Sequence, residues 1–182
     1  MIAEFLEHIA TKLHMENPYF NVAAVNCIKL SDGKVIKDWE TGSEMNYKGL
    51  TETLGFYIRF NGEIEYEECE PRNSFATQQK TVIPCRLVAF QVADPLTISP
   101  SKLLYKLSED LKHIDFSDFD YNYKSGMKVD LLKSNHNPIE VFEEEIGAKK
   151  GPKSPLVMIA IDFNAQFEAF YFDCKTSSYV YN

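Results

Sequence analysis

The residues best placed to do chemistry are the acidic side chains that follow Gly62. The run consists of Glu63, Glu65, Glu67, Glu68 and Glu70. On a β-strand Glu63, Glu65 and Glu67 share one face, because successive side chains point to opposite sides. Such carboxylates could act together in acid–base catalysis or bind calcium. The same alternation is typical of a half-exposed strand with a solvated side, which is our preferred interpretation, and an acidic wall facing a partner or a channel is a third.

Histidine and cysteine offer no further chemistry at recognisable spacing. The four histidines are His8, His14, His113 and His136, and the four cysteines are Cys27, Cys69, Cys85 and Cys174. No CxxC pair or metal-ligand spacing occurs, so a zinc site or a Cys27 or Cys174 nucleophile would need distant residues to converge. Phosphate-binding loops, dinucleotide fingerprints and nucleophile elbows are also missing. We therefore expect no enzyme, no cofactor and no metal, with unpaired thiols and histidines in local roles.

Composition describes an acidic globular protein. The chain has 182 residues, of which 45% are hydrophobic and 25% charged, and its net charge is −8 with a pI of about 5.0. This charge disfavours nonspecific binding to nucleic acid and to anionic membranes. Only Lys149, Lys150 and Lys153 form a basic cluster. The N-terminus interrupts its apolar pattern with Glu4 and Glu7, unlike a secretory signal, so a cytoplasmic protein is expected.

The first half of the chain predicts one helix followed by strands. Residues 1–13 carry an amphipathic stripe that Asn17-Pro18 ends. Strands are expected at 22–30 and 35–39 around Asp32-Gly33, and at 54–60 and 63–69 around Asn61-Gly62, with an exposed loop at 40–53 between them. Asn-Gly favours the type I′ turn of a tight hairpin, so we expect a hairpin here.

The second half predicts alternating elements. A long strand at 81–93 contains Pro84, which indicates an edge or a bulge. Ser99-Pro100 begins a helix that runs to about residue 114. We then expect a strand at 127–132 and a short helix at 138–146, with Glu143, Glu144 and Glu145 on the solvated side of that helix. A mobile basic loop is expected at 148–155. It is followed by a long strand or hairpin at 156–172 and by a further strand at 177–181.

These elements predict a single α+β domain over residues 1–182. Its antiparallel β-sheet packs against two main α-helices, with a short third helix and a long C-terminal strand.

The order of these elements resembles that of bacteriophage tail-terminator and head–tail connector (neck) proteins. The matching segments are the helix at 1–13, the strands between 22 and 93, the helix at 101–114 and the strand at 156–172. The resemblance implies a homo-oligomeric ring of six or twelve copies in the virion, assembled in the bacterial cytoplasm between portal and tail. It suggests that Lys149, Lys150, Lys153, Glu44 and Tyr47 lie at interfaces, and that Glu63, Glu65 and Glu67 face a channel through which DNA passes without sequence-specific binding and without any membrane contact.

Two alternatives remain open from the sequence. One is an acidic interaction module, such as an inhibitor or immunity-like protein, whose surface matches a basic partner. The other is a hydrolase or small-ligand-binding protein whose pocket assembles from distant residues.

Overall fold

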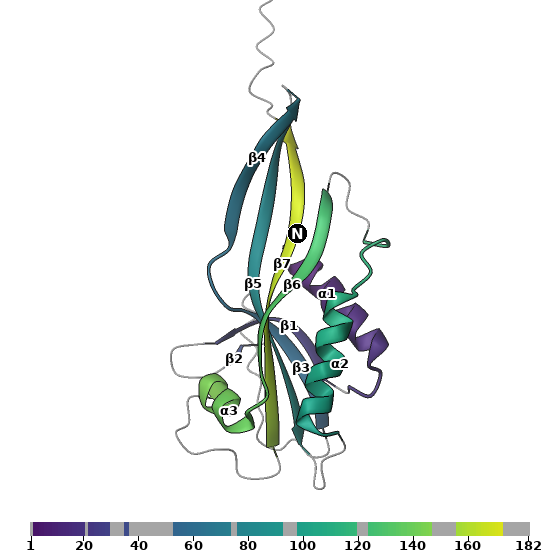
Figure 1. The fold of residues 1–182 in the computed structure, drawn as a ribbon, viewed down its shortest axis with the longest axis vertical. Coiled ribbons are helices and arrows are strands. Elements are labelled where there is room, and N and C mark those ends of the chain that lie inside the picture. The colour runs from purple at the N-terminus through teal and green to yellow at the C-terminus, as the bar shows by residue number, and fades with distance from the viewer. Residues whose placement is uncertain are drawn as a thin grey trace, which may run out of the picture.

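The computed structural model describes residues 2–20, 22–29, 35–36, 53–73, 76–92, 98–119, 124–146 and 156–172. In chain order the elements are α1 (Ile2–Glu16), β1 (Val22–Lys29), β2 (Val35–Ile36), β3 (Thr53–Phe60), β4 (Glu65–Asn73), β5 (Ala76–Val92), α2 (Pro100–Lys112), β6 (Lys124–Asn135), α3 (Pro138–Ile146) and β7 (Leu156–Phe172). The predicted α+β class is confirmed (Figure 1). None of the helices described is long and apolar enough to span a membrane.

The strands form one sheet whose central pair is unusually long. The order is β2-β1-β3-β5-β7-β6, and β4 also pairs with β5. All pairings are antiparallel except that of β1 with β3, which is parallel. β5 and β7 have 17 residues each and pair from Ala76↔Phe172 to Val92↔Leu156. The C-terminal segment is therefore one continuous strand, with no turn at Asn164.

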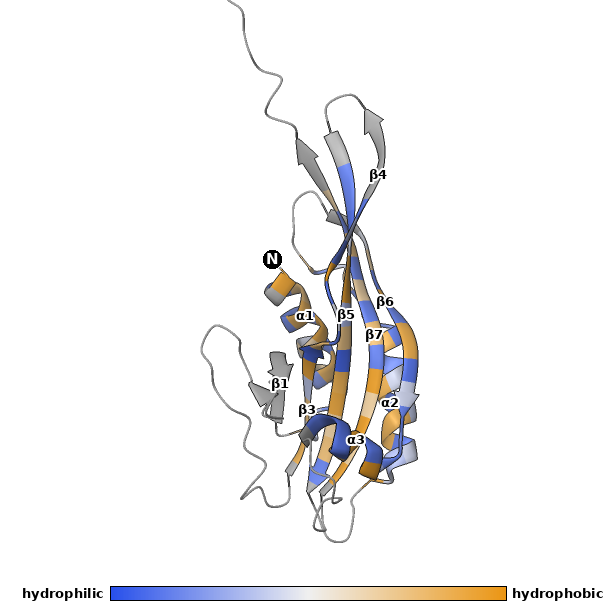
Figure 2. Cartoon of the chain, turned by 90° about the vertical axis from the view of Figure 1, so that its left-hand side faces the viewer, coloured by the Kyte–Doolittle hydropathy of each residue, from blue (hydrophilic) through white to orange (hydrophobic). Residues whose placement is uncertain are grey.

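Helices cover both faces of the sheet. α1 and α2 pack on one face, where their buried apolar stripes meet the core residues of β3, β5 and β7. The core side chains of the helices are Phe5, Leu6, Ile9, Leu13, Leu103, Leu107 and Leu111. α3 lies on the opposite face, and Figure 2 shows it in front of the strands with α2 behind β6. Beneath α3, Val88, Phe90 and Met158 are also buried.

The hairpin predicted at Asn61-Gly62 is wrong. β3 and β4 do not pair with each other; both pair with β5, one after the other along the same edge. The Asn61 N–H donates to the Pro84 carbonyl at 2.9 Å, at the junction of the two strands. Burying β3 against the apolar half of β5 outweighs the local turn preference, since tertiary packing commonly overrides propensity. The predicted start of β4 at Glu63 is also two residues too early, because the strand begins at Glu65.

Pro84 explains why the junction falls where it does. A proline has no N–H to donate to a neighbouring strand. In a β-strand, the N–H and C=O of one residue point to the same side. The Pro84 carbonyl faces the gap between the end of β3 and the start of β4, so the missing N–H would have pointed into that gap as well. A Cβ on Gly62 would come within 3.3 Å of the Pro84 ring, so the chain passes very close at this point. Pro84 therefore marks a break in pairing on one side only, while β7 pairs with it on the other.

Other predicted elements are close to those observed. The antiparallel pairing Ile28↔Ile36 agrees with a β1–β2 hairpin, although its turn lies outside the described residues. α3 has the predicted bounds, and β6 is longer than expected at both ends. The predicted loops at 40–53 and 148–155 and the strand at 177–181 also fall outside the described residues, except for Thr53, which begins β3. Also outside them are Glu44, Tyr47, Lys149, Lys150 and Lys153.

Candidate functional site

One end of the sheet extends beyond α2 and α3, and we call it the arm; α1 still contacts it, because the Phe5 ring packs against Phe167 of β7. The arm consists of β4, residues 76–82 of β5, residues 166–172 of β7 and residues 124–128 of β6. Figure 1 shows these strands rising beyond α2 and α3. Their order is β4-β5-β7-β6, so among the described residues β4 pairs only with β5 and β6 pairs only with β7. Within the part of the chain that the structure describes, the arm thus has two open edges.

The acidic side chains lie on the β4 edge, as solvent-exposed groups. Glu63, Glu65 and Glu67 are all exposed. Glu65 is opposite Val82 and Glu67 opposite Lys80, which places both carboxylates on the α3 side of the sheet. Glu67 accepts a hydrogen bond from Lys80 at 2.8 Å. The shared face predicted for Glu65 and Glu67 is present, whereas Glu63 precedes the strand.

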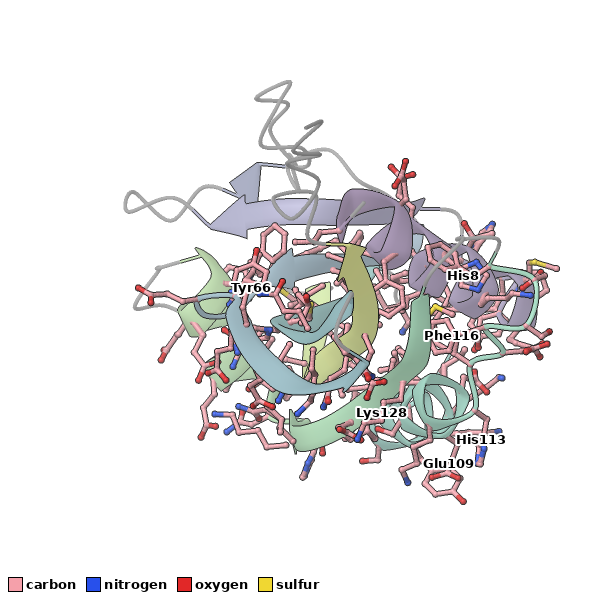
Figure 3. The ribbon with its side chains drawn as sticks, turned by 90° about the horizontal axis from the view of Figure 1, so that it is seen from above. His8, Tyr66, Glu109, His113, Phe116 and Lys128 are labelled. Atoms are coloured by element: carbon pink, nitrogen blue, oxygen red, sulfur yellow. The ribbon has the colours of Figure 1, made fainter. Side chains whose placement is uncertain are left out.

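The other open edge is basic. Lys128 and Lys133 on β6 have side chains that are 58% and 71% exposed. Lys128 lies 2.8 Å from Asp130, whose carboxylate also accepts a hydrogen bond from Gln166 on the adjacent strand. Figure 3 shows Lys128 and Tyr66 on well-separated strands of the coiled sheet. The sequence did not single out these lysines, although Lys128 lies within the strand expected at 127–132, because whether this strand forms an edge of the sheet depends on nonlocal pairing.

Two irregularities shape the β6 edge. Register shifts occur between Ser125 and Lys128 and between Leu131 and Lys133. In the first, Gly126 has a φ of +63°, and a Cβ there would come within 2.9 Å of Glu168. Only glycine adopts this conformation without strain. Between the two bulges, Lys128 to Leu131 is a regular edge.

A buried cluster of charged residues ties α3 to the sheet. Glu145 is fully buried and accepts hydrogen bonds from Arg59 Nε at 2.9 Å, Arg59 Nη2 at 2.6 Å and Tyr57 at 2.9 Å. Its Oε1 also accepts from Arg86 Nη1 at 3.2 Å. The prediction that Glu145 lies on a solvated helix face is wrong. Val141 is buried one turn earlier, and this i, i+4 spacing was the available signal.

The second half of the cluster is the pair of Arg86 and Asp162. Arg86 donates two parallel hydrogen bonds to the carboxylate, from Nε at 2.5 Å and from Nη2 at 2.9 Å, and a third to Glu144 at 2.6 Å. Asn61 donates to Asp162 at 3.2 Å. Every carboxylate oxygen of Glu145 and Asp162 therefore already accepts at least one hydrogen bond from the protein.

Protonation follows from this pairing. Burial acts to raise the pKa of Glu145, but the hydrogen bond and charge of Arg59, the Tyr57 hydroxyl and the Arg86 charge together lower it below the ordinary value of a glutamate. The cluster thus holds Glu145 as an ionised carboxylate whose oxygens are all hydrogen-bonded within the chain, so it is a structural tie between α3 and the sheet.

The described histidines and cysteines do not assemble a site. His8 packs beside Phe116, with its Nε2 3.1 Å from the Asp115 carbonyl oxygen (Figure 3). Burial raises the pKa of the Cys85 thiol, which keeps it protonated and unreactive. Within the described segments, no three His, Cys, Asp or Glu side chains come together as metal ligands. The side chains of Cys27, Cys69 and Cys174 lie outside the description.

A cleft of about 630 Å³ lies between α2 and Tyr19. Its wall includes Ile98 and Leu103, and Tyr105 stands 70% exposed beside it. The charged groups at its rim, Lys106 and Asp110, pair with each other at 3.0 Å. The volume suits a small ligand, but no nucleophile–base pair lines it.

The chain matches no protein-family model, and none of the curated proteins is significantly similar to it in sequence.

Proposed function

We propose that this chain is a structural subunit of a phage head–tail junction, tail-terminator-like or neck-like, that assembles into a homo-oligomeric ring. The observation that carries the proposal is the arm, with its two open edges on opposite sides of one four-stranded unit. Its charged groups are directed outward, whereas the charged cluster under α3 is satisfied internally.

Open edges have a physical cost for a protein that stays alone. Unpaired backbone N–H and C=O groups invite pairing with another chain, and monomeric proteins commonly cover or shorten such strands. β6 has 12 residues and β4 has nine, so neither edge strand has been shortened in the way that is common in monomeric proteins. A ring uses a heterologous contact in which one surface of each copy meets a different surface of the next, so two unlike edges suit it.

The acidic groups fit the same proposal. In a ring with the α3 side of the arm turned inward, Glu65 and Glu67 face the central passage, and Glu63 lies at its rim. Lys80 and Lys128 lie on the same side of the sheet, where they pair with Glu67 and Asp130. The carboxylates thus offset the lysines and keep DNA from adhering as it passes. The resemblance in element order to neck and tail-terminator proteins points to six or twelve copies, located in the virion.

Size-exclusion chromatography with light scattering, followed by electron microscopy, tests the proposal. The full chain is measured from micromolar to near-millimolar concentration. A single closed ring is expected at the upper end of that range, with a mass that is an integral multiple of the 20.9 kDa chain. A strict monomer over the whole range contradicts ring formation, and isolation with one strongly basic partner would favour the inhibitor-like alternative.

A further inference from the structure

The two open edges of the arm carry opposite charge. β4 (Glu65–Asn73) contains four glutamates and one arginine, and β6 (Lys124–Asn135) contains three lysines and one aspartate. The single β6 acid, Asp130, is engaged by Lys128 and by Gln166 of β7. The β6 edge therefore presents net positive charge and the β4 edge net negative charge.

The edges also run in opposite directions. β4 is antiparallel to β5, β5 to β7, and β7 to β6. β4 and β6 are consequently antiparallel to each other. A rotation about an axis along the strands leaves strand direction unchanged, so it places β6 of one copy antiparallel to β4 of the next, and the alternation of the sheet continues.

Charge then selects between the ways in which edges could pair. Pairing β4 with β4, or β6 with β6, sets like charges opposite each other, which destabilises cross-strand contacts. Pairing β4 with β6 sets opposite charges together. The first two pairings give closed two-fold dimers, and the third is the head-to-tail contact that builds a ring.

The relevant side chains lie at the same level of the sheet. Glu65 is opposite Val82, Val82 opposite Gln166, and Gln166 opposite Lys128. Glu65 and Lys128 thus stand at the two ends of one row across the arm, and both are on its α3 side. If the strands tilt against the ring axis, the row shifts along the strand, and a two-residue shift brings Glu63 or Glu67 to the position of Glu65.

We propose that β4 of one copy pairs with β6 of a neighbouring copy, and that the acidic β4 edge recognises the basic β6 edge. This inference rests on the proposed ring and names the surfaces that close it. Charged edge residues also protect monomers from aggregation. That role alone does not account for edges of opposite sign, nor for the exposed Tyr66 at 57% on the β4 edge and the exposed Leu132 at 59% where β6 continues below the arm.

Complementation between two charge-reversed variants tests the pairing. One variant is Glu63→Lys with Glu65→Lys, and the other is Lys124→Glu with Lys128→Glu. Glu63 and Glu65 make no hydrogen bond or ion pair within the described segments, so their replacement spares the fold. In each variant alone, positions 63 and 65 on the β4 edge and positions 124 and 128 on the β6 edge carry charges of the same sign, and the concentration for half-assembly rises at least about tenfold, the effect of a change near 1.4 kcal/mol per contact.

Mixing the two variants in equal amounts gives the decisive result. Positions 124 and 128 of each β6 edge then meet oppositely charged side chains at positions 63 and 65 of the other variant, and rings return with strictly alternating composition. Assembly is measured by sedimentation velocity, and composition by native mass spectrometry. Lys102→Glu on α2 and Glu143→Lys on α3 are matched reversals at exposed positions away from both edges, and they leave assembly unchanged.

The outcomes separate this inference from the proposed function. If both variants form rings as readily as the wild type does, the edge pairing is overturned and the proposed ring assembly stands. Folded variants that fail alone and also fail when mixed likewise overturn it. A wild-type chain that never assembles overturns both proposals. Circular dichroism of each variant establishes that the comparison is between folded proteins.

Discussion

The helix-covered half of the sheet and the arm share two strands but use them differently. In the covered half, every residue from Cys85 to Gln91 of β5 and from Met158 to Phe163 of β7 is buried. In the arm, the described β5 residues from Gln78 to Thr81 are all polar. The apolar core continues into the arm through β7, where Phe167 and Ala169 are buried on the side that faces α1. On the opposite side of the arm lie Glu65 and Lys128 of the outer strands and Lys80 of β5.

Charged residues show the same division. Under α3, Arg59 and Arg86 are buried, and Arg59 donates two hydrogen bonds to Glu145 while Arg86 donates two to Asp162. On the arm, Glu65 and Lys128 are exposed at opposite edges. A closed network stabilises one chain in one conformation, whereas open charges are available to another chain. The burial of a charged side chain and the number of its hydrogen bonds within the chain, more than its residue type, therefore distinguish an internal tie from a contact surface.

The largest expected difference between the halves is in stability. Phe163→Ala removes a fully buried ring from the core on β7 and should lower the free energy of unfolding by about 3–5 kcal/mol. Gln79→Ala, on the arm part of β5, should change it by no more than about 0.5 kcal/mol. Urea denaturation followed by circular dichroism measures both. Equal losses would show that the arm is as tightly integrated as the core, against the division drawn above.

Breaking the buried charge network should cost somewhat less. Glu145→Gln leaves Arg59 buried without its carboxylate, and a loss of about 3 kcal/mol is expected, the lower end for breaking a buried ion pair. Arg86 keeps Asp162 and Glu144, which limits the damage. Glu143→Gln, an exposed neighbour on α3, is the matched control and should be nearly neutral. A neutral Glu145→Gln would show that α3 is held by Val141 packing alone.

Much of the fold could be predicted from the sequence because it depends on local signals. Apolar periodicity indicated α1, and Ser99-Pro100 marked the start of α2. The arm could not be recognised, since strand pairing is nonlocal. Asn61-Gly62 has the signature of a tight turn, yet β5 pairs with the strands on both sides of it. No local signal within residues 54–69 indicates that β5, which begins at Ala76, will pair with both segments.

The candidate site divides in the same way. Alternation placed Glu65 and Glu67 on one face correctly, because period two is a property of the strand itself. The charged cluster was missed, since Arg59, Arg86, Glu145 and Asp162 come from four elements and meet only in the folded sheet. Glu145 was placed on the solvated face because it belongs to a run of three glutamates, and only the last of them is buried.

The dependence of stability on pH tests whether Glu145 is an internal tie. Its pKa in the folded chain is lower than that of an ordinary glutamate, because burial, which raises it, is outweighed by the contacts with Arg59, Tyr57 and Arg86. A depressed pKa means that the stabilising contribution is complete above the unfolded value and is lost as pH falls through the folded value. The difference in unfolding free energy between wild type and Glu145→Gln should therefore stay constant from about pH 8 to pH 5.5 and shrink below about pH 4.5. Denaturation series at matched ionic strength give this difference directly. If it instead grows as pH falls, burial has raised the pKa, the carboxyl group is neutral near pH 5, and the cluster is not the saturated ion network that separates the covered half from the arm.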